Sequence, residues 1–273
     1  MIEKHVDSSV FDYSIVFTKS SGHGMQLAQQ AVADKVDTVI AVGGDGTINE
    51  VASALVGTDV TFGIIPCGSG NGLSRFLDIP MDTKKAIENL NRGRAEIIDT
   101  AIANGRRFFN MAGFGFDAHI AEVFAQKKER GFITYARSTF SEIINYKPRT
   151  YHIEVDNNRY EREAFMLSFA NSSQYGNNAH VSPKASVQDG LLDVCIIKAF
   201  SIWRFPEMIF HMFAKTADTS KFVEIIKGKH IVIKQLQPGP IHLDGEPFMM
   251  NEDIEINIIP ASLKIIVGDK YRS

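Results

Sequence analysis

The most constraining feature of this sequence is a continuous apolar run, residues 38–42 (TVIAV), which ends in the glycine-rich string GGDG. A strand without polar alternation is buried on both faces, which is the usual setting of a parallel sheet covered by helices. A helical pattern follows at once over residues 47–56. Because parallel strands need crossover connections, usually helices, this feature predicts an α/β domain.

Neighbouring segments extend the same pattern and then change it. Residues 13–17 (YSIVF) and 61–65 are predicted as further strands, and residues 24–36 and 72–77 as helices. Beyond Ile97 strands follow one another more closely, with turn signals between them. Strands are predicted there at 108–112, 151–156, 165–170, 192–197, 230–234, 254–259 and 263–267, and helices at 132–146 and 202–214. We therefore expect an α/β domain over residues 1–97 and a mainly antiparallel β domain with inserted helices over residues 98–273.

Composition limits the classes of function. A net charge of -3 gives no reason to expect nucleic acid as the partner. Two cysteines, Cys67 and Cys195, cannot build a disulfide framework, which favours a reducing cytoplasm. The N-terminus lacks the apolar core of a signal peptide, and the most apolar stretch, residues 203–213, is interrupted by charged residues and proline. A protein of this kind would visit a membrane rather than reside in it.

The string GGDGTINE, residues 43–50, carries the clearest chemical signal. It joins a buried strand to a helix, where free backbone N–H groups and the helix dipole attract an anion such as phosphate. Thr47 is expected to cap the helix and to donate its hydroxyl to a phosphate. Asp45 is unusual beside phosphates, and it is explained if it orients a loop amide or holds Mg²⁺. The alternative is a capped turn without a chemical role.

A second glycine-rich loop follows the next predicted strand, with the sequence PCGSGNG over residues 66–72. Consecutive parallel strands place such loops side by side at the carboxyl edge of the sheet, where ligands bind in open α/β sheets. Two adjacent loops would suit a triphosphate better than either loop alone. Taken by itself, the second loop is equally compatible with a plain turn.

Two further strings contain acidic residues. In LDGE, Asp244 and Glu246 would project from the same face of an extended chain, and their like charges would raise the pKa of one member toward that of a general base. The alternative there is a tight turn with two solvated acids. The string SVQDGLLD, residues 186–193, indicates a β-turn closing a hairpin. The histidines have no zinc-ligand spacing, and a Gly-x-Ser-x-Gly elbow is absent from the sequence.

Several strings occur in a familiar order: GGDGTINE, PCGSGNGLSRFLDIP, IIDTA, FFNMAGFGFDA, DGLLDV and LDGEP. This order, spread over nearly the whole chain, resembles the diacylglycerol kinase catalytic-domain superfamily, which includes sphingosine and ceramide kinases and bacterial lipid kinases. The resemblance implies an α/β domain related to NAD kinase and phosphofructokinase, followed by a β-sandwich. It implies ATP as the phosphoryl donor, Mg²⁺ as the metal and a lipid hydroxyl as the acceptor.

The resemblance also assigns roles to residues. The residues that it places at the nucleotide are Thr18, Gly43, Gly44, Asp45, Gly46, Thr47, Asn49, Glu50, Gly68, Ser69 and Asn71. Asp45 and Asp99 resemble acids linked to the catalytic Mg²⁺. Asp189, with the carbonyl groups of Ser186 and Leu191, resembles a structural Mg²⁺ site. Asp244 and Glu246 resemble the acidic pair of which one member is the general base.

Two departures from the family pattern matter. The second loop reads Gly-Ser-Gly-Asn-Gly where diacylglycerol kinases usually carry Gly-Thr-x-Asn-Asp, so the chain is closer there to sphingosine kinases. The family also begins with a strand and an Asn-Pro-x-Ser-Gly loop that this sequence does not contain. We therefore expect an incomplete nucleotide site, either because the true start lies upstream of Met1 or because catalysis has been lost.

The sequence thus predicts an ATP-dependent lipid kinase, cytoplasmic and peripheral to the membrane, and leaves a homodimer open. An NAD-kinase-like enzyme and a catalytically inactive nucleotide- or lipid-binding homologue are the alternatives. Membrane contact is expected at the cationic cluster Lys127, Lys128 and Arg130. An apolar helical set is expected to line or cover a lipid cleft: Trp203, Phe205, Met208, Ile209, Met212 and Phe213. The alternative for both is an ordinary solvated cluster and a packed helix.

Overall fold

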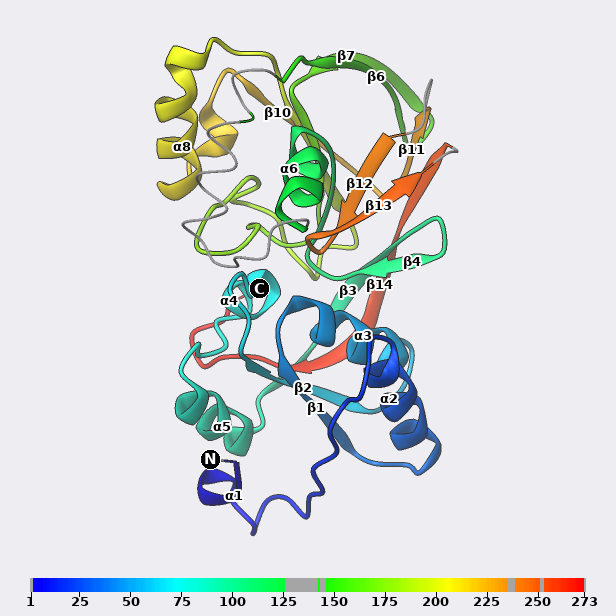
Figure 1. The fold of residues 1–273 in the computed structure, drawn as a ribbon, viewed down its shortest axis with the longest axis vertical. Coiled ribbons are helices and arrows are strands. Elements are labelled where there is room, and N and C mark those ends of the chain that lie inside the picture. Colours follow the sequence, from blue (N-terminus) through cyan, green and yellow to red (C-terminus); the bar gives the residue numbers. More distant parts are fainter. Residues whose placement is uncertain (1, 126–141, 143–145, 235–238, 251–252, 273) are drawn as a thin grey trace.

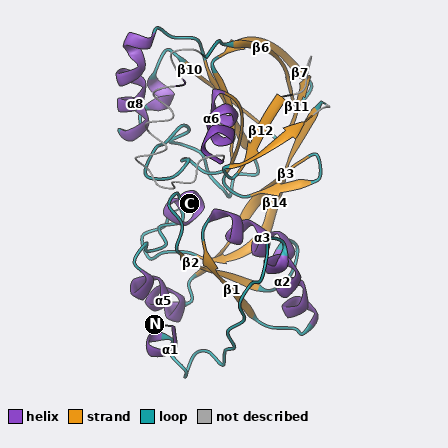
Figure 2. Ribbon diagram, viewed as in Figure 1, coloured by secondary structure: helices purple, strands orange, loops and turns teal. Residues whose placement is uncertain are grey.

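The computed structural model describes residues 2–125, 142, 146–234, 239–250 and 253–272. Figure 1 shows two halves, an α/β half that holds most of the first hundred residues and a β-rich half that holds most of the remainder. The secondary structure is mapped in Figure 2. Within the described residues, no helix combines the length and the apolar character needed to cross a bilayer.

Two parallel strands form the start of the α/β half. β1 (Thr38–Gly43) pairs with β2 (Thr61–Pro66), and the crossover between them is α3 (Asp45–Leu55). Helices α2 (His23–Ala33) and α3 cover one face of the sheet, and α5 (Thr83–Arg92) covers the other together with α1 (Ile2–His5). Helices on both sides of the sheet explain why residues 38–42 carry no polar alternation, although β1 is only partly buried and Val42 is 46% exposed.

The last strand of the chain connects the two halves. β14 (Ile254–Ile266) pairs in parallel with β2 through Ile265 and Phe62, and antiparallel with β3 (Ala95–Ala103). Its register shifts between Ile259 and Leu263, which lets one strand run from the β-rich half into the α/β half (Figure 1). The core of the α/β half therefore includes side chains from the C-terminal end of the chain.

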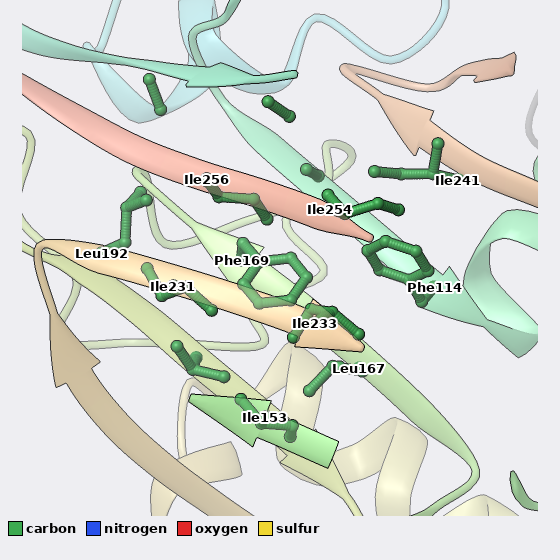
Figure 3. Packing of buried hydrophobic residues seen from close by; sticks show 14 of the residues in the cluster. Phe114, Ile153, Leu167, Phe169, Leu192, Ile231, Ile233, Ile241, Ile254 and Ile256 are labelled. Carbon is green, nitrogen blue, oxygen red and sulfur yellow. The ribbon is translucent and has the colours of Figure 1, made fainter. Parts of the chain in front are cut away.

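The β-rich half contains two sheets packed face to face. Among the described residues, one sheet continues from β14 through β11 (His230–Lys234) and β6 (Arg149–Val155) to β7 (Asn158–Ala164), and β4 (Arg106–Phe108) pairs with β3. The other sheet has the order β10 (Val223–Gly228), β9 (Leu192–Ile197), β8 (Met166–Ala170), β5 (Met111–Gly115), β12 (Gly239–Leu243) and β13 (Glu246–Met250). Figure 3 shows apolar side chains from both sheets filling the space between them.

The remaining helices of the described residues are α4 (Gly72–Phe76), α6 (Phe116–Ala125) and α8 (Phe205–Phe213). α4 follows the second glycine-rich loop, and α6 and α8 cover the outer face of the second sheet. Short 3₁₀ turns, η1 (Ile202–Arg204) and η2 (Ala217–Thr219), flank α8. The expected fold class, a parallel α/β domain followed by a mainly antiparallel β-sandwich with inserted helices, is confirmed.

Several predicted elements need correction. Residues 13–17 are not a strand: the segment has no regular secondary structure, and the side chains of Val16 and Phe17 are 62% and 81% exposed. A strand forms only within a hydrogen-bonded ladder, and none of the described strands pairs with this segment. The strand predicted over 108–112 is divided between β4 and β5, whereas 254–259 and 263–267 form the single strand β14.

Other elements were not predicted from the sequence. They are α1, α5, α6, β3, β7, β10, β12 and β13. Most of the helix predicted over 132–146 lies outside the described residues, as do Lys127, Lys128 and Arg130.

Candidate functional site

The two glycine-rich loops touch each other through their backbones. A Cβ atom on Gly68 would lie 2.7 Å from the Cα atom of Gly44, and one on Gly44 would lie 3.2 Å from the Cα atom of Gly68. The backbone N–H of Cys67 donates to the carbonyl of Gly43 at 2.8 Å. Because a side chain at Gly68 would meet backbone atoms, this close approach requires a glycine. The side-by-side placement expected from parallel strands is what the structure shows.

Asp45 links the first loop to the second. Its Oδ2 atom accepts a hydrogen bond from the backbone N–H of Asn71 at 3.0 Å. Asn71 has a left-handed backbone with φ of 52°, and its own amide bonds to the N–H and the carbonyl of Gly68 at 3.1 and 2.7 Å. Burial raises the pKa of the Asp45 carboxyl, and the nearby charge of Asp244 raises it further, against the loop N–H groups that lower it. Of the two roles considered for Asp45, orienting a loop amide is therefore seen directly.

Helix α3 begins without a side-chain cap. Its N-cap residue is Gly44, which has no side chain with which to accept a capping hydrogen bond. The expectation that Thr47 caps this helix is therefore wrong, because Thr47 already lies inside the first turn. Its side chain packs on Gly43 instead, where a Cβ atom would come within 2.7 Å of the Thr47 Cβ atom. The helix start is left able to receive an anion.

Asp244 forms the tip of a hairpin and acts as a structural anchor. Asp244 and Gly245 have φ of 50° and 86°, as in a type I′ turn between β12 and β13. Asp244 Oδ1 accepts from the backbone N–H groups of Asn110 and Met111 at 2.9 and 3.0 Å. The Oδ2 atom accepts from the N–H of Phe109 and from the Asn49 side-chain amide, both at 2.9 Å.

These four hydrogen bonds correct the expected geometry of the acidic pair. The chain reverses at Asp244 and Gly245, so Asp244 and Glu246 do not project from one face of an extended strand. A carboxylate that accepts four N–H groups is held in place, with both oxygens engaged by the protein.

Glu246 is the member of the pair that faces the first glycine-rich loop. It is the first residue of β13, and a Cβ atom on Gly46 would lie 2.6 Å from Glu246 Oε1. Partial burial raises the pKa of the Glu246 carboxyl, and the charges of Glu50 and Asp244 add to the increase. In Figure 1 the turn between β12 and β13 lies between the two halves, on the side of α3. The geometry thus brings an acid from the β-rich half to the loop of the α/β half.

Glu50 connects α3 to the start of α2. Its carboxylate accepts from the backbone N–H groups of Gly22 and Gly24 at 2.6 and 3.1 Å and from the Ser21 hydroxyl at 3.2 Å. Thr18 lies in the exposed segment just before this helix, without regular secondary structure. Ser69 is exposed at the second loop. The nucleotide contacts predicted for Thr18, Asn49, Glu50 and Ser69 stay predictions.

Asp99 is buried in β3, and its carboxylate connects β14 to the turn before β9. Its Oδ1 atom accepts from the backbone N–H of Ala261, within the irregular part of β14, and its Oδ2 atom accepts from the N–H of Gly190, both at 2.7 Å. These bonds hold the turn before β9 against β14. The link between Asp99 and a catalytic Mg²⁺ stays a prediction.

The ammonium group of Lys227 lies beside the Asp189 carboxylate. Lys227 Nζ donates to Asp189 Oδ2 at 3.0 Å and lies 3.1 Å from Asp193 Oδ1, while Asp189 Oδ1 accepts from the Leu191 N–H at 3.1 Å. Burial alone would lower the pKa of Lys227, but the two acids outweigh burial and raise it. Both Asp189 oxygens are therefore already engaged by groups of the chain itself.

The predicted Mg²⁺ ligands Ser186, Asp189 and Leu191 do lie in one turn, but their metal role stays a prediction. Within the part of the chain that the structure describes, no group of three or more His, Cys, Asp and Glu side chains gathers to hold a metal ion.

Some contributors to the site were not predicted from the sequence. The backbone N–H groups that hold Asp244 lie at the end of β4 and the start of β5, and the sequence offers no signal for them. Lys227 stands opposite Asp193 in the register of β10 and β9. Such cross-strand pairs appear only once the register is known.

Comparison with known proteins agrees with the fold and the motifs. The model of the diacylglycerol kinase catalytic domain matches residues 1–103, and that of the YegS C-terminal NAD kinase beta sandwich-like domain matches residues 110–267. A Klebsiella pneumoniae protein named "Probable lipid kinase YegS-like" is 30% identical over 93% of this chain and 85% of its own length. A Bacillus subtilis protein named "Diacylglycerol kinase" is 27% identical over 86% of this chain and 80% of its own length.

Solved structures show the same fold. A Bacillus anthracis diacylglycerol kinase crystal structure superposes with a TM-score of 0.75 at 22% identity, covering 98% of this chain and 91% of the other. Another crystal structure from that organism superposes with a TM-score of 0.83 at 25% identity, covering 98% of this chain and 90% of the other. The chain therefore belongs to the diacylglycerol kinase catalytic-domain family, with the kinase domain followed by the family's C-terminal β-sandwich domain.

Proposed function

We propose that this kinase transfers the γ-phosphoryl group of ATP to the hydroxyl of a lipid, with Glu246 as the general base. The observation that carries this proposal is the position of Glu246 Oε1 against Gly46 at the start of α3. An acid with a raised pKa stands there beside a loop suited to phosphate. The names of the relatives, a lipid kinase and a diacylglycerol kinase, support a lipid as acceptor.

The proposed step balances in atoms and charge. Glu246 takes the proton of the lipid hydroxyl, and the resulting oxygen forms a bond to the γ-phosphorus of ATP. The bond between that phosphorus and the β–γ bridging oxygen breaks, and ADP leaves with the electron pair. The first-turn amides of α3 and the second loop orient the phosphates, and Asp244 keeps the hairpin that carries Glu246 in position.

Mg²⁺ is proposed as the metal, with Asp45 as its protein ligand. Mg²⁺ in such sites is commonly held by one or two carboxylates together with the substrate phosphates, which fits a site where side chains alone form no metal cage in the described residues. The raised pKa of Asp45 indicates a carboxylate whose charge lacks full compensation. When bound, the ion would offset charge on the transferring phosphoryl group.

The test is a kinase assay with γ-labelled ATP and a total lipid extract, followed by separation of labelled lipids. We expect label in a lipid for the parent protein, and about 10²–10⁴-fold less in Glu246→Gln. The matched control is Glu163→Gln, which changes an exposed glutamate on β7. Label on NAD instead of lipid would support the NAD-kinase alternative, and nucleotide binding without any transfer would support an inactive homologue.

The acceptor lipid is proposed only as a class: diacylglycerol, a sphingoid base or a related lipid with a free hydroxyl. The same assay with single purified lipids distinguishes these acceptors. A cytoplasmic protein that meets its acceptor at the membrane surface is the setting that this proposal requires.

A further inference from the structure

The outer side of α8 and its preceding turn exposes an unusual apolar surface. Ile202, Trp203, Phe210 and Phe213, here called the aromatic surface, are 38%, 89%, 67% and 44% exposed. Trp203 and Phe210 are seven residues apart and Phe213 follows three later, which places them on one side of a helical path. Figure 1 shows α8 at the outside of the β-rich half. A contiguous patch of exposed apolar side chains commonly marks an interaction site, whereas single exposed apolar residues are ordinary.

The opposite side of α8 explains how the helix is held. Met208 is buried, and Phe205 and Met212 pack with it against the apolar cluster on the outer face of the second sheet. Of the six residues that the sequence grouped together, only Trp203 and Phe213 are exposed, and Phe210 joins them. The helix is therefore fixed by one face and presents the other to a partner.

The charges around the aromatic surface favour an anionic partner. Within residues 198–221, Arg204 pairs with Glu207 and Lys198 pairs with Glu224, while Asp218 pairs with Lys184. The remaining lysines of this region are Lys215 and Lys221, in a chain whose net charge is -3. Lys215 and Lys221 are both exposed. An excess of positive charge beside exposed aromatic side chains matches an anionic bilayer, whose headgroup region accommodates tryptophan and attracts lysine. Two copies of the chain docked through this surface would instead bring like charges together.

We propose that the aromatic surface inserts into the headgroup region of an anionic lipid bilayer and holds the β-rich half at the membrane. This inference rests on the proposed lipid kinase function, because it places the domain that carries Glu246 where a lipid acceptor is found. The described residues include no membrane-spanning helix, so contact of this kind is peripheral.

Trp203 makes the proposal directly measurable, because it is the single tryptophan in the chain. Vesicles of phosphatidylcholine with phosphatidylglycerol should shift its emission to shorter wavelength, and vesicles of phosphatidylcholine alone should do so much less. Brominated acyl chains should then quench the emission in the parent protein without any substitution. Unchanged emission and no quenching with the anionic vesicles would overturn the proposal.

A variant pair locates the contact. Phe210→Ser combined with Phe213→Ser keeps the tryptophan reporter and should weaken vesicle binding by about tenfold or more. Phe17→Ser is the matched control, because Phe17 is 81% exposed but lies far along the chain on the α/β half. Equal vesicle binding by the double variant and the parent would reject this surface, as would an emission shift that follows protein concentration in the absence of vesicles.

Measuring vesicle binding and lipid phosphorylation separately distinguishes a failure of this inference from a failure of the proposed function. The double variant should phosphorylate a short-chain lipid in detergent like the parent and lose activity only toward the same acceptor in vesicles. If no lipid is phosphorylated by the parent, the proposed function fails while vesicle binding still decides the membrane contact.

Discussion

Glu246 reaches from the β-rich half to Gly46 at the start of α3, where a Cβ atom on the glycine would lie 2.6 Å from Glu246 Oε1. The two residues are 200 positions apart in the chain and belong to different halves of the molecule. Because Gly46 has no side chain, the Glu246 carboxylate can lie directly against the first glycine-rich loop. This contact joins the chemistry of the two halves.

Replacing Gly46 by alanine should displace Glu246 rather than unfold the protein, because the atom in the way is the end of a flexible side chain. We expect Gly46→Ala to keep the melting temperature of the parent and to lower kcat by roughly 10²-fold, since small misplacements of a reacting group are costly. The measurement is kcat and melting temperature for the single variant and for the combination with Glu246→Gln. Independent, multiplying losses in the double variant would contradict a shared cause.

Glu246 should control the acid side of the pH profile. A general base acts only when deprotonated, so kcat/KM should rise with pH through the raised pKa of the Glu246 carboxyl and level off above it. That rise should occur at a higher pH than the ordinary glutamate value of 4.5. In Glu246→Gln the rise should disappear along with most of the activity. A parent-like acid limb in this variant would assign the titration to another group.

Asp244→Asn should affect stability more than the chemical step. An asparagine would keep one acceptor oxygen but turn an NH₂ group toward donors that now bond to the carboxylate. We expect a loss of about 2–3 kcal/mol in the free energy of unfolding, in line with hydrogen bonds to a charged group. Urea denaturation measures this loss, and Asp59→Asn, at an exposed position before β2, is the control. Full stability with a large loss of kcat would instead make Asp244 the base.

Gly68→Ala should disrupt nucleotide binding. The new Cβ atom would meet the Gly44 backbone at 2.7 Å, so the two loops must separate. We expect the Kd for ATP to increase by about tenfold or more, because the phosphate contacts of both loops depend on their spacing. Isothermal titration measures the Kd. The control is Gly239→Ala in β12, whose Cβ atom would meet only the Arg149 side chain at 3.9 Å. Equal affinities for the two variants would show that loop contact is dispensable.

Because Lys227 pairs with Asp189, the thermal stability of the protein should not depend on a divalent metal at this turn. In the absence of nucleotide, we expect the melting temperature of the parent to be the same with Mg²⁺ and with a chelator, because the ammonium already neutralises Asp189 and Asp193. Lys227→Met should lower the melting temperature, since it leaves Asp193 buried without its cation. Lys229→Met is the control. A parent that is stabilised by Mg²⁺, with the effect lost in Asp189→Ala, would restore the metal site that the sequence motif predicts.

Local pattern was enough to predict the α/β half and the location of its loops. The apolar run over residues 38–42 and the glycine strings after two successive strands dictate parallel strands whose carboxyl ends meet, and the contact between Gly44 and Gly68 follows from that arrangement. Turn residues likewise delimited β6, β8, β9 and β11 in the β-rich half. These features depend on side-chain chemistry and spacing within short segments.

Pairing between distant segments was decided by the tertiary structure alone. Residues 13–17 have the composition of a strand but form none, because no described strand pairs with them, whereas β14 becomes one strand through partners in both halves. The same holds for the acids, which the sequence suggested as a pair. The type I′ turn instead places Asp244 against the backbone N–H groups that hold it and Glu246 against Gly46. Sequence determined which groups are present, and the long-range packing of the sheets determined which neighbours each group has and therefore what it can do.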